Sequence, residues 1–531
     1  MSFTEFVKRR YELIILLVFL LVVFILELRV TIHSPIAFGD EGHHTRMAQW
    51  IAENKEYPVY VPIEGTKLIQ SNYARPPLWH LLQGGFYTIF GFSEIIVKVL
   101  TPFIVSITGL ATYLLVKRIF DEKSGIIASI ITVTFPAVVT YAVLFYVDSL
   151  LTLYFSLFVF LLLLGIKEEN KRYLFLAGTF GAFSFLTKLI GVFVLFIEGL
   201  TFVYGVTKLK SNFRQMIKIY ALPLFVTLLF ILPFLLRNTA FYNTPLCTTL
   251  LPFDVSKCDI NEYTPKYQFS QAIEQVGTNV GLIRFGLTDY LRFAYGNIWF
   301  VGISIVGGLF LLKRYEGIKI FVIGFTILGF LVLFIKLLNV RAEDVARYTL
   351  SWSPVIATVM AVYLSELYSF LEQRQKYLGI VIILLVIFFS YTSLTQKLDV
   401  MKTVKKFSPL FFEACDWVKE NLPKDSIIST VWGHHTTYNC QRMAAGNLAD
   451  FQLSNDPEFI VKSAKENGIT HIFVQKFSIR NQPLQEGYTI DFVKLLENNP
   501  DKFKKVYENG PDLNSCLSRG GCDGNIIYEI I

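Results

Sequence analysis

The chain has 531 residues, of which 53% are hydrophobic and only 17% are charged, and its mean hydropathy is +0.48. Soluble domains carry about 25% charged residues, so this composition excludes a soluble globular protein and indicates a polytopic membrane protein. The net charge of +7 does not indicate nucleic-acid binding, because the Lys and Arg residues lie mostly in short loops beside apolar segments.

Eleven apolar windows approach the length of about 20 residues that a membrane-spanning helix requires. The first follows Lys8, Arg9 and Arg10 without a signal-peptide cleavage site, so it predicts an uncleaved span. The eleven predicted spans cover residues 12–30, 94–116, 124–143, 148–166, 173–187, 190–206, 217–236, 291–312, 318–336, 350–370 and 377–394.

Loop charges predict the orientation of these spans, because cytoplasmic loops carry an excess of Lys and Arg. Every second loop is short and basic, which places the N-terminus in the cytoplasm, and an odd number of spans then places the C-terminus outside. We therefore expect a multi-pass membrane protein. A bacterial signal or eukaryotic retention motif is missing from the sequence, so we expect an archaeal or bacterial plasma membrane as its location.

Cysteine placement agrees with this orientation, because all six cysteines fall on the predicted outer side, where disulfides form. Six reduced thiols remain the alternative. The natural local pairs are Cys247 with Cys258 and Cys516 with Cys522, which leaves Cys415 with Cys440.

The loop between the first two spans, residues 31–93, carries the densest set of polar groups. It contains the acid pair Asp40–Glu41 and then Arg75, which is followed by two prolines. Apolar spacing predicts a helix along the membrane surface over residues 41–53. Residues 76–91 are apolar and aromatic but too short to span, and they predict a second helix that is interfacial or re-entrant. A simple loop anchor is one interpretation; the other is chemistry on a lipid-linked anion, which an acid pair facing a fixed cation would suit.

The segment after the last span changes character. Residues 1–395 are predicted to form the transmembrane domain, and residues 405–531 a separate extracytoplasmic α/β domain with alternating helices and strands. Residues 456–468 show helix signals, with an acidic N-cap, Pro457 and a terminal Gly468. The pair His434–His435 is expected in a loop at the end of a strand.

Three carboxylates are candidates for catalysis: Asp40, Glu41 and Asp148. Asp40 suits a general base, because partial dehydration at a membrane surface raises the pKa of a carboxylate. Asp148 lies in a short turn between two spans, where an acid is costly unless it is paired. The alternative for Asp148 is a helix N-cap.

Three cations on the same predicted side, Arg75, Lys188 and Arg347, lie apart from any basic run, so the orientation rule does not explain them. A lipid phosphate would require such cations, although snorkelling towards headgroups is an equal alternative. No cofactor is certain from the sequence. A divalent metal ion is the candidate, with His43 and His44 as ligands, but no established metal motif is present.

These motifs resemble the GT-C superfamily of polytopic glycosyltransferases, near the protein O-mannosyltransferase and aminoarabinose transferase branch. The matching segments appear in the family's order over residues 10–370. They are FGDEGHHTRMA from Phe38, ARPPLWHLL from Ala74, YVDSLLTLYF from Tyr146, FSFLTKLIG from Phe183 and ARYTLSWSP from Ala346.

The resemblance implies that a sugar is transferred with inversion from a polyprenyl-phosphate donor on the outer face. It matches Asp40 to the family's catalytic acid of the first loop, Asp148 to its second aspartate, and Arg75 to its phosphate-binding cation. The other implied substrate contacts are His80, Lys188, Arg347 and Tyr348. Ala74 stands where the aminoarabinose branch has a metal-binding Glu, and the tryptophan-rich motif of oligosaccharyltransferases is absent.

We therefore predict a membrane glycosyltransferase whose acceptor is a lipid, a glycan or a protein outside the cytoplasm. A transporter or flippase for lipid-linked sugars is the main alternative. Transporters place ionisable groups near the middle of the membrane and often contain repeats, whereas these groups cluster at one interface. A non-catalytic scaffold is a third alternative.

Overall fold

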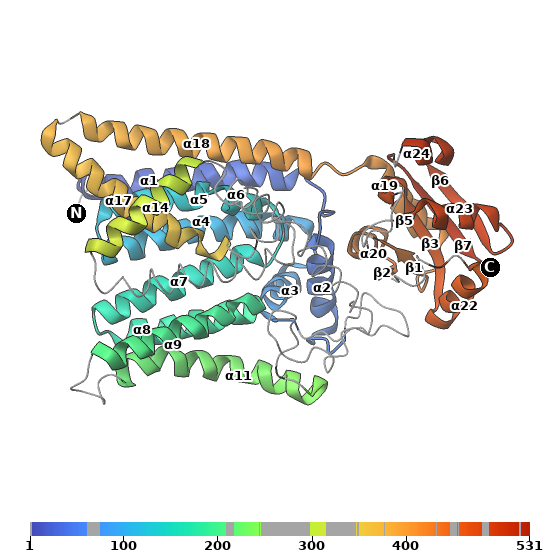
Figure 1. Ribbon diagram of the computed structural model, residues 1–531, viewed down its shortest axis with the longest axis horizontal. Coiled ribbons are helices and arrows are strands. Elements are labelled where there is room, and N and C mark those ends of the chain that lie inside the picture. The colour runs from blue at the N-terminus through green and yellow to red at the C-terminus, as the bar shows by residue number, and fades with distance from the viewer. Residues whose placement is uncertain are drawn as a thin grey trace, which may run out of the picture.

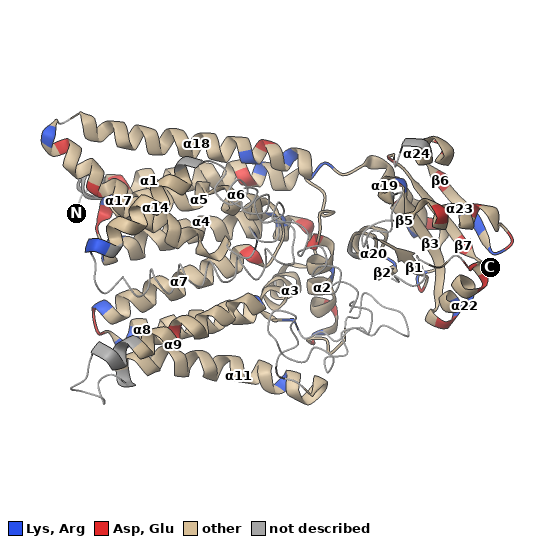
Figure 2. Cartoon of the chain, viewed as in Figure 1, with Lys and Arg blue, Asp and Glu red and all other residues tan. Residues whose placement is uncertain are grey.

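The computed structural model describes residues 3–60, 75–208, 217–243, 245, 298–314, 347, 350–375, 377–431, 433–446, 454, 456–480, 488–519 and 522–531. Long apolar helices form a bundle, and most charged residues lie at its two ends (Figures 1 and 2). The bundle helices are α1 (Phe3–Ile32), α4 (Glu94–Ile119), α5 (Glu122–Thr134), α6 (Pro136–Val143), α7 (Asp148–Lys167), α8 (Lys171–Thr187), η1 (Leu189–Val192), α9 (Phe193–Lys208), η2 (Ile217–Ala221), α11 (Leu222–Tyr242), α14 (Ile298–Arg314), η4 (Leu350–Trp352), α17 (Ser353–Arg374) and α18 (Leu378–Val404).

Six of the described helices have the length and composition of a membrane span, or seven if α5 and α6 form one bent span. The two helices meet at 54°, because Pro136 has no N–H to continue the α5 ladder. The predicted count of eleven is therefore not reproduced in the described ranges. Helix α8 has only 17 residues, the apolar segment Leu189–Val203 is also short, and the window 318–336 lies outside the described residues.

Helix α7 is the centre of the bundle. It packs against α4 on one side and α8 on the other, and 78% of its apolar window is buried inside the protein. Asp148, its first residue, is itself buried, with 1% of its surface exposed. This placement brings one carboxylate next to several other chain segments.

The two predicted surface helices of the first loop are present as α2 (Glu41–Asn54) and α3 (Leu78–Phe90). They pack against each other and lie between the bundle and the C-terminal region (Figure 1). The buried face of α2 carries Met47 and Ile51, which follow the helical spacing predicted from the sequence.

The C-terminal region contains a mixed sheet with strand order β2-β1-β3-β7-β6, flanked by helices. Strands β2, β1 and β3 are parallel, whereas β7 is antiparallel to both β3 and β6. The elements are α19 (Pro409–Asn421), β1 (Ile427–Thr430), α20 (Gly433–Cys440), β2 (Met443–Gly446), α22 (Pro457–Asn467), β3 (Ile469–Gln475), β4 (Ile479–Arg480), β5 (Tyr488–Thr489), α23 (Ile490–Asn498), β6 (Phe503–Asn509), α24 (Leu513–Arg519) and β7 (Asn525–Ile530).

The helix signals before α22 are confirmed. The Asp456 side chain accepts a hydrogen bond from the Glu458 N–H at 2.9 Å, and Gly468 ends the helix with φ of +71°, a conformation that glycine adopts without strain. The prediction for His434–His435 is wrong, because both positions lie within α20 rather than in a loop. Most residues of this short helix are polar, so it lacks the apolar periodicity from which a helix is predicted.

Two of the predicted disulfides are present. Cys415–Cys440 joins α19 to α20, and Cys516–Cys522 joins α24 to the segment before β7. The remaining predicted pair, Cys247 with Cys258, lies outside the described residues.

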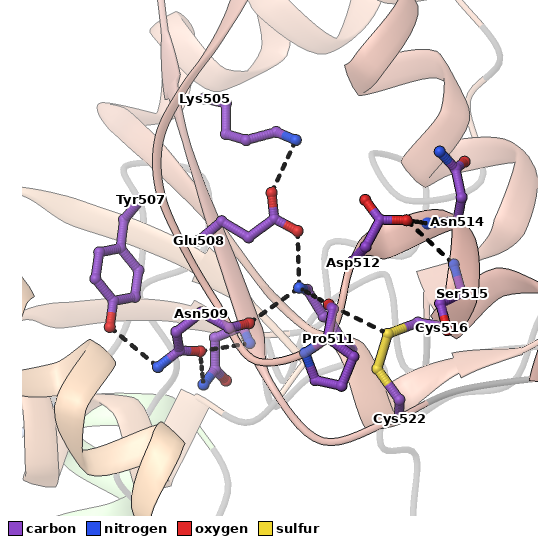
Figure 3. Close-up of polar contacts among 12 residues, drawn as sticks. Lys505, Tyr507, Glu508, Asn509, Pro511, Asp512, Asn514, Ser515, Cys516 and Cys522 are labelled. Carbon is purple, nitrogen blue, oxygen red and sulfur yellow. Dashed lines mark hydrogen bonds and ion pairs between the residues drawn. A yellow bond between two sulfur atoms is a disulfide. The ribbon is translucent and has the colours of Figure 1, made fainter.

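The loop before α24 is held by one buried ammonium group. Lys476 Nζ donates to Glu508 Oε1 at 2.7 Å and to the carbonyl oxygens of Asn509 and Pro511 at 2.9 and 2.6 Å. Figure 3 shows these acceptors side by side, with Cys516 bonded to Cys522 nearby. The buried Lys476 ammonium group therefore has all its hydrogen-bond acceptors within this region.

Candidate active site

Four of the predicted site residues meet in one chain of ion pairs. Lys188 Nζ lies 2.6 Å from Asp148 Oδ1, Arg347 Nε lies 2.9 Å from Asp148 Oδ2, and Arg347 Nη1 lies 2.9 Å from Asp40 Oδ2. The order is therefore Lys188–Asp148–Arg347–Asp40, which we call the outer ion-pair chain. Residues separated by as many as 307 positions in the sequence are brought together at one end of the bundle.

Each acid of this chain lies at the start of a helix but does not cap it. Asp40 occupies the N-cap position of α2, yet its side chain accepts no capping hydrogen bond. Val147, not Asp148, occupies the N-cap position of α7, so the capping alternative for Asp148 does not hold. Both carboxylates instead face cations contributed by other segments.

The side chains of the outer ion-pair chain differ in their exposure to solvent. The Asp148 side chain is 1% exposed, those of Lys188 and Arg347 are 16% and 17% exposed, and that of Asp40 is 34% exposed. Asp40 is therefore the member that a substrate can reach most easily. Asp148 holds the two cations from inside.

The surroundings change the proton affinity of both cations. Burial, followed by the nearby Arg347 charge, lowers the pKa of Lys188 to about 8, although Asp148 acts in the opposite direction. Burial also acts to lower the pKa of Arg347, but the Asp148 and Asp40 carboxylates outweigh it and raise that pKa well above its ordinary value. Arg347 is a permanent cation, whereas Lys188 can lose its proton in mildly alkaline solution.

Tyr146 positions the backbone beside Asp40. Its hydroxyl accepts a hydrogen bond from the Asp40 N–H at 3.1 Å and donates to the Phe38 carbonyl at 3.2 Å. The Arg347 guanidinium lies over its ring at 4.5 Å. Gly39 has φ of +50°, and a Cβ there would collide with the Tyr146 hydroxyl. Glycine is thus required at this position of the FGDEG segment.

Glu41 has surroundings quite different from those of its neighbour. Its side chain is fully buried and pairs with Lys405 at 2.7 Å. It also accepts hydrogen bonds from the backbone N–H groups of Ala37, Phe38 and Phe145 at 3.3, 3.0 and 3.2 Å. These contacts leave Glu41 enclosed by the protein, and they tie the first loop to the segment after α18.

The C-terminal region makes two further contacts, one with the start of α4 and one with the first loop. The Tyr438 hydroxyl donates to Glu94 Oε1 at 2.8 Å, and the Asn439 amide donates to the Ile36 carbonyl at 3.1 Å. Both donors lie on α20, which packs against α2. The loop that carries Asp40 therefore contacts both the helical bundle and the C-terminal region.

The remaining predicted residues lie around a group of three histidines. The ligand atoms of His43, His44 and His80 all lie within 4.8 Å of one another, and the three residues are 1–3% exposed. Burial lowers the pKa of His44 and His80 well below the ordinary value, and the Arg75 charge lowers both further. Arg75 is itself exposed. Tyr348 and Ala74 lie outside the described residues.

Sequence reasoning missed two residues that organise the site, Tyr146 and Lys405. Tyr146 belongs to the YVDSLL segment, so its place two residues before Asp148 was a usable signal. Lys405 lies at the predicted domain junction, among Lys402 and Lys406. Nothing in that basic run distinguishes the lysine that is buried from those that are solvated.

Comparison with known proteins supports the predicted resemblance. Residues 74–236 match the family model described as dolichyl-phosphate-mannose-protein mannosyltransferase. These residues include Arg75, His80, Asp148 and Lys188. The chain is a glycosyltransferase of the GT-C fold. No curated protein matches the chain in sequence. The match to a mannosyltransferase family favours a transferase over the alternative of a transporter or flippase.

Solved structures show the same GT-C fold over nearly the whole chain. The Archaeoglobus fulgidus oligosaccharyltransferase in the apo form is 12% identical, with a TM-score of 0.66 over 96% of this chain and 81% of that one. ArnT from Cupriavidus metallidurans bound to undecaprenyl phosphate is 11% identical, with a TM-score of 0.63 over 98% of both chains. The Archaeoglobus enzyme in complex with Zn and sulfate is 14% identical, with a TM-score of 0.62 over 86% of this chain and 67% of that one.

Proposed function

We propose that this GT-C enzyme transfers a sugar, with inversion, from a polyprenyl-phosphate carrier to a hydroxyl-bearing lipid, glycan or protein. The accessible end of the outer ion-pair chain carries this proposal, because Asp40 is both 34% exposed and fixed by Arg347. Support for the donor comes from the undecaprenyl phosphate bound in ArnT and from the dolichyl-phosphate family description.

In the proposed reaction Asp40 removes the proton of the acceptor hydroxyl as its oxygen bonds to the anomeric carbon. The bond from that carbon to the phosphate oxygen breaks, and its electron pair leaves with the lipid phosphate. A carboxylate held within hydrogen-bond reach of the acceptor can act in this way. One displacement of this kind inverts the anomeric configuration.

The charge balance of the outer ion-pair chain favours this step. The two carboxylates and two cations balance before the reaction. Once Asp40 accepts the proton, Lys188 and Arg347 face only Asp148, so one positive charge is uncompensated as the phosphate gains negative charge. Such preorganised charge stabilises a transition state without reorganisation of solvent. Arg75 would contact the phosphate as a further cation, with Tyr348 as a neighbouring substrate contact.

Glu41 has a supporting role in this proposal, since its carboxylate is enclosed by Lys405 and backbone donors. A divalent cation at His43 and His44 remains part of the proposal and would add positive charge beside Asp40. The acids themselves need no metal to approach one another, because Arg347 bridges Asp40 and Asp148.

We also infer that the chain spans the plasma membrane with its N-terminus in the cytoplasm and its C-terminal domain outside. Support comes from the basic loops and from the position of the N-terminus at the end of the bundle away from the C-terminal sheet (Figure 1). The proposed domains are residues 1–395 and 405–531, although α18 runs on to Val404.

The test is release of the lipid phosphate from polyprenyl-phosphate sugars by purified wild type and Asp40→Asn. We expect the variant to lose about 10²–10⁴-fold in rate, the usual contribution of a general base. Asp399→Asn, at an exposed acid on α18, is the matched control and should keep the wild-type rate. Equal rates for wild type and Asp40→Asn would remove Asp40 as the base.

A further inference from the structure

The histidine group joins the two helices of the first loop. His43 and His44 lie on α2, and His80 lies on α3. His44 Nδ1 and His80 Nε2 are 2.9 Å apart, and the ring centroids of the three residues lie 5.0–6.2 Å from one another. Three imidazoles thus converge from two helices on one buried point.

This convergence has the dimensions of a metal site. Zinc bound by imidazole nitrogens at about 2.0–2.1 Å in a tetrahedron places those nitrogens about 3.3 Å apart. The observed ligand atoms lie within 4.8 Å of one another, so small rotations of the rings bring all three to one ion.

The buried surroundings provide a second and independent observation. Among the described residues, His44 Nε2, Trp79 Nε1 and both amide atoms of Gln83 are buried without a hydrogen-bond partner. Buried polar atoms of this kind usually bind water or ligand groups.

We infer that His43, His44 and His80 form a binding site for a zinc-class dication. An all-imidazole ligand set selects zinc and related transition metals, whereas magnesium and calcium prefer oxygen ligands. The inference extends the divalent cation of the proposed function by adding the third ligand and the class of metal. It does not depend on sugar transfer.

The ion has a defined task in this loop. It joins α2 to α3 at a point next to the Tyr146 ring, whose centroid is 6.1 Å from that of His44. Because Tyr146 also holds the Asp40 backbone, the metal fixes the start of α2 on which Asp40 depends. These histidines are therefore positioning residues with respect to Asp40.

The experiment measures metal on the full-length chain in detergent after chelator treatment and re-equilibration with zinc. We expect stoichiometric zinc in the wild type, and loss of that zinc in His44→Gln and His80→Gln. His33→Gln is the matched control, because His33 is exposed at the end of α1 and should not change the zinc content. Zinc that is absent from the wild type, or retained equally by all variants, would overturn the inference.

Two further readouts separate ligation from simple packing. His80→Cys introduces another zinc ligand, so it should restore the zinc that His80→Gln loses; failure to do so while the chain remains folded counts against the site. Cobalt substituted for zinc should give the visible absorption of a four-coordinate site in the wild type and in His33→Gln, but not in His44→Gln or His80→Gln. Because neither readout uses a sugar donor, failure of the proposed transfer reaction would leave both results unchanged.

Discussion

Asp40 and Glu41 are adjacent in sequence, yet their carboxylates belong to two ion-pair groups of opposite character. Asp40 is one-third exposed and ends a chain of alternating charges. Glu41 and Lys405 are both 0% exposed and pair with each other inside the protein. Two adjacent acids can thus have different surroundings, one carboxylate accessible at the surface and the other enclosed beneath the loop.

The largest expected effect concerns the buried pair. Glu41→Gln or Lys405→Met should lower the free energy of unfolding by about 3–5 kcal/mol, because each leaves an uncompensated buried charge. Thermal unfolding in detergent measures this change. Lys402→Met is the control, since its pair with Asp399 is exposed and exposed pairs contribute little.

The double variant Glu41→Leu with Lys405→Met sharpens this comparison. Removing both charges together should recover most of the loss, because buried ion pairs replaced by apolar residues are often neutral. If Glu41→Gln and Lys405→Met were each as stable as Lys402→Met, the buried Glu41–Lys405 pair would not have the structural role described.

The next effect concerns the cation that links the two acids. Arg347→Gln should reduce the rate of donor cleavage by about 10²–10³-fold, the usual cost of removing one preorganised charge donor, with little change in the unfolding temperature. Arg46→Gln, at a partly exposed arginine of α2, is the matched variant. A loss of stability equal to the loss of activity would indicate a structural role for Arg347 instead.

A pH dependence follows from Lys188. Its pKa of about 8 lies below the value of about 10.4 expected in the unfolded chain. Between these values the unfolded chain binds more protons, so this group makes folding more favourable as pH rises. Activity should change in the opposite direction and decline above pH 8, because deprotonation removes a charge that faces the phosphate in the proposed reaction.

Measurement of kcat/KM against pH tests this prediction in the free enzyme. Lys188→Arg should move the decline to higher pH, since arginine keeps its proton. A decline at the same pH in wild type and Lys188→Arg would assign it to another group.

The smallest expected effect is that of Tyr146→Phe. The variant keeps the ring beneath Arg347 but loses the hydroxyl that bonds the Asp40 N–H and the Phe38 carbonyl. A net contribution of about 0.5–1.5 kcal/mol per hydrogen bond predicts a two- to tenfold lower kcat. Tyr391→Phe on the exposed face of α18 should have no effect, and an unchanged kcat in Tyr146→Phe would exclude this positioning role.

Part of this site could be predicted from sequence because charge beside hydrocarbon must be paired. Asp148, Lys188 and Arg347 stood out as isolated charges near apolar segments, and the structure brings them together with Asp40. The different roles of Glu41 and Asp40 could not be predicted from sequence. The sequence does not show that Glu41 is buried, nor that its partner is Lys405, 364 positions away. Helix α2 was predictable from its apolar spacing and α3 from its apolar, aromatic composition, whereas α20 was not predictable, because its buried residues are mostly polar.

The Glu41–Lys405 pair has a consequence for the order in which the protein is made. At about 5–20 residues per second, the 364 positions between them correspond to roughly 20–70 s of synthesis. Throughout that time the Glu41 carboxylate has no ammonium partner, and α20, which supports α2, does not yet exist. The first loop of the chain is therefore completed by one of its last segments. A nascent chain halted before Lys405 would carry every residue of the outer ion-pair chain without the support that fixes Asp40 in place.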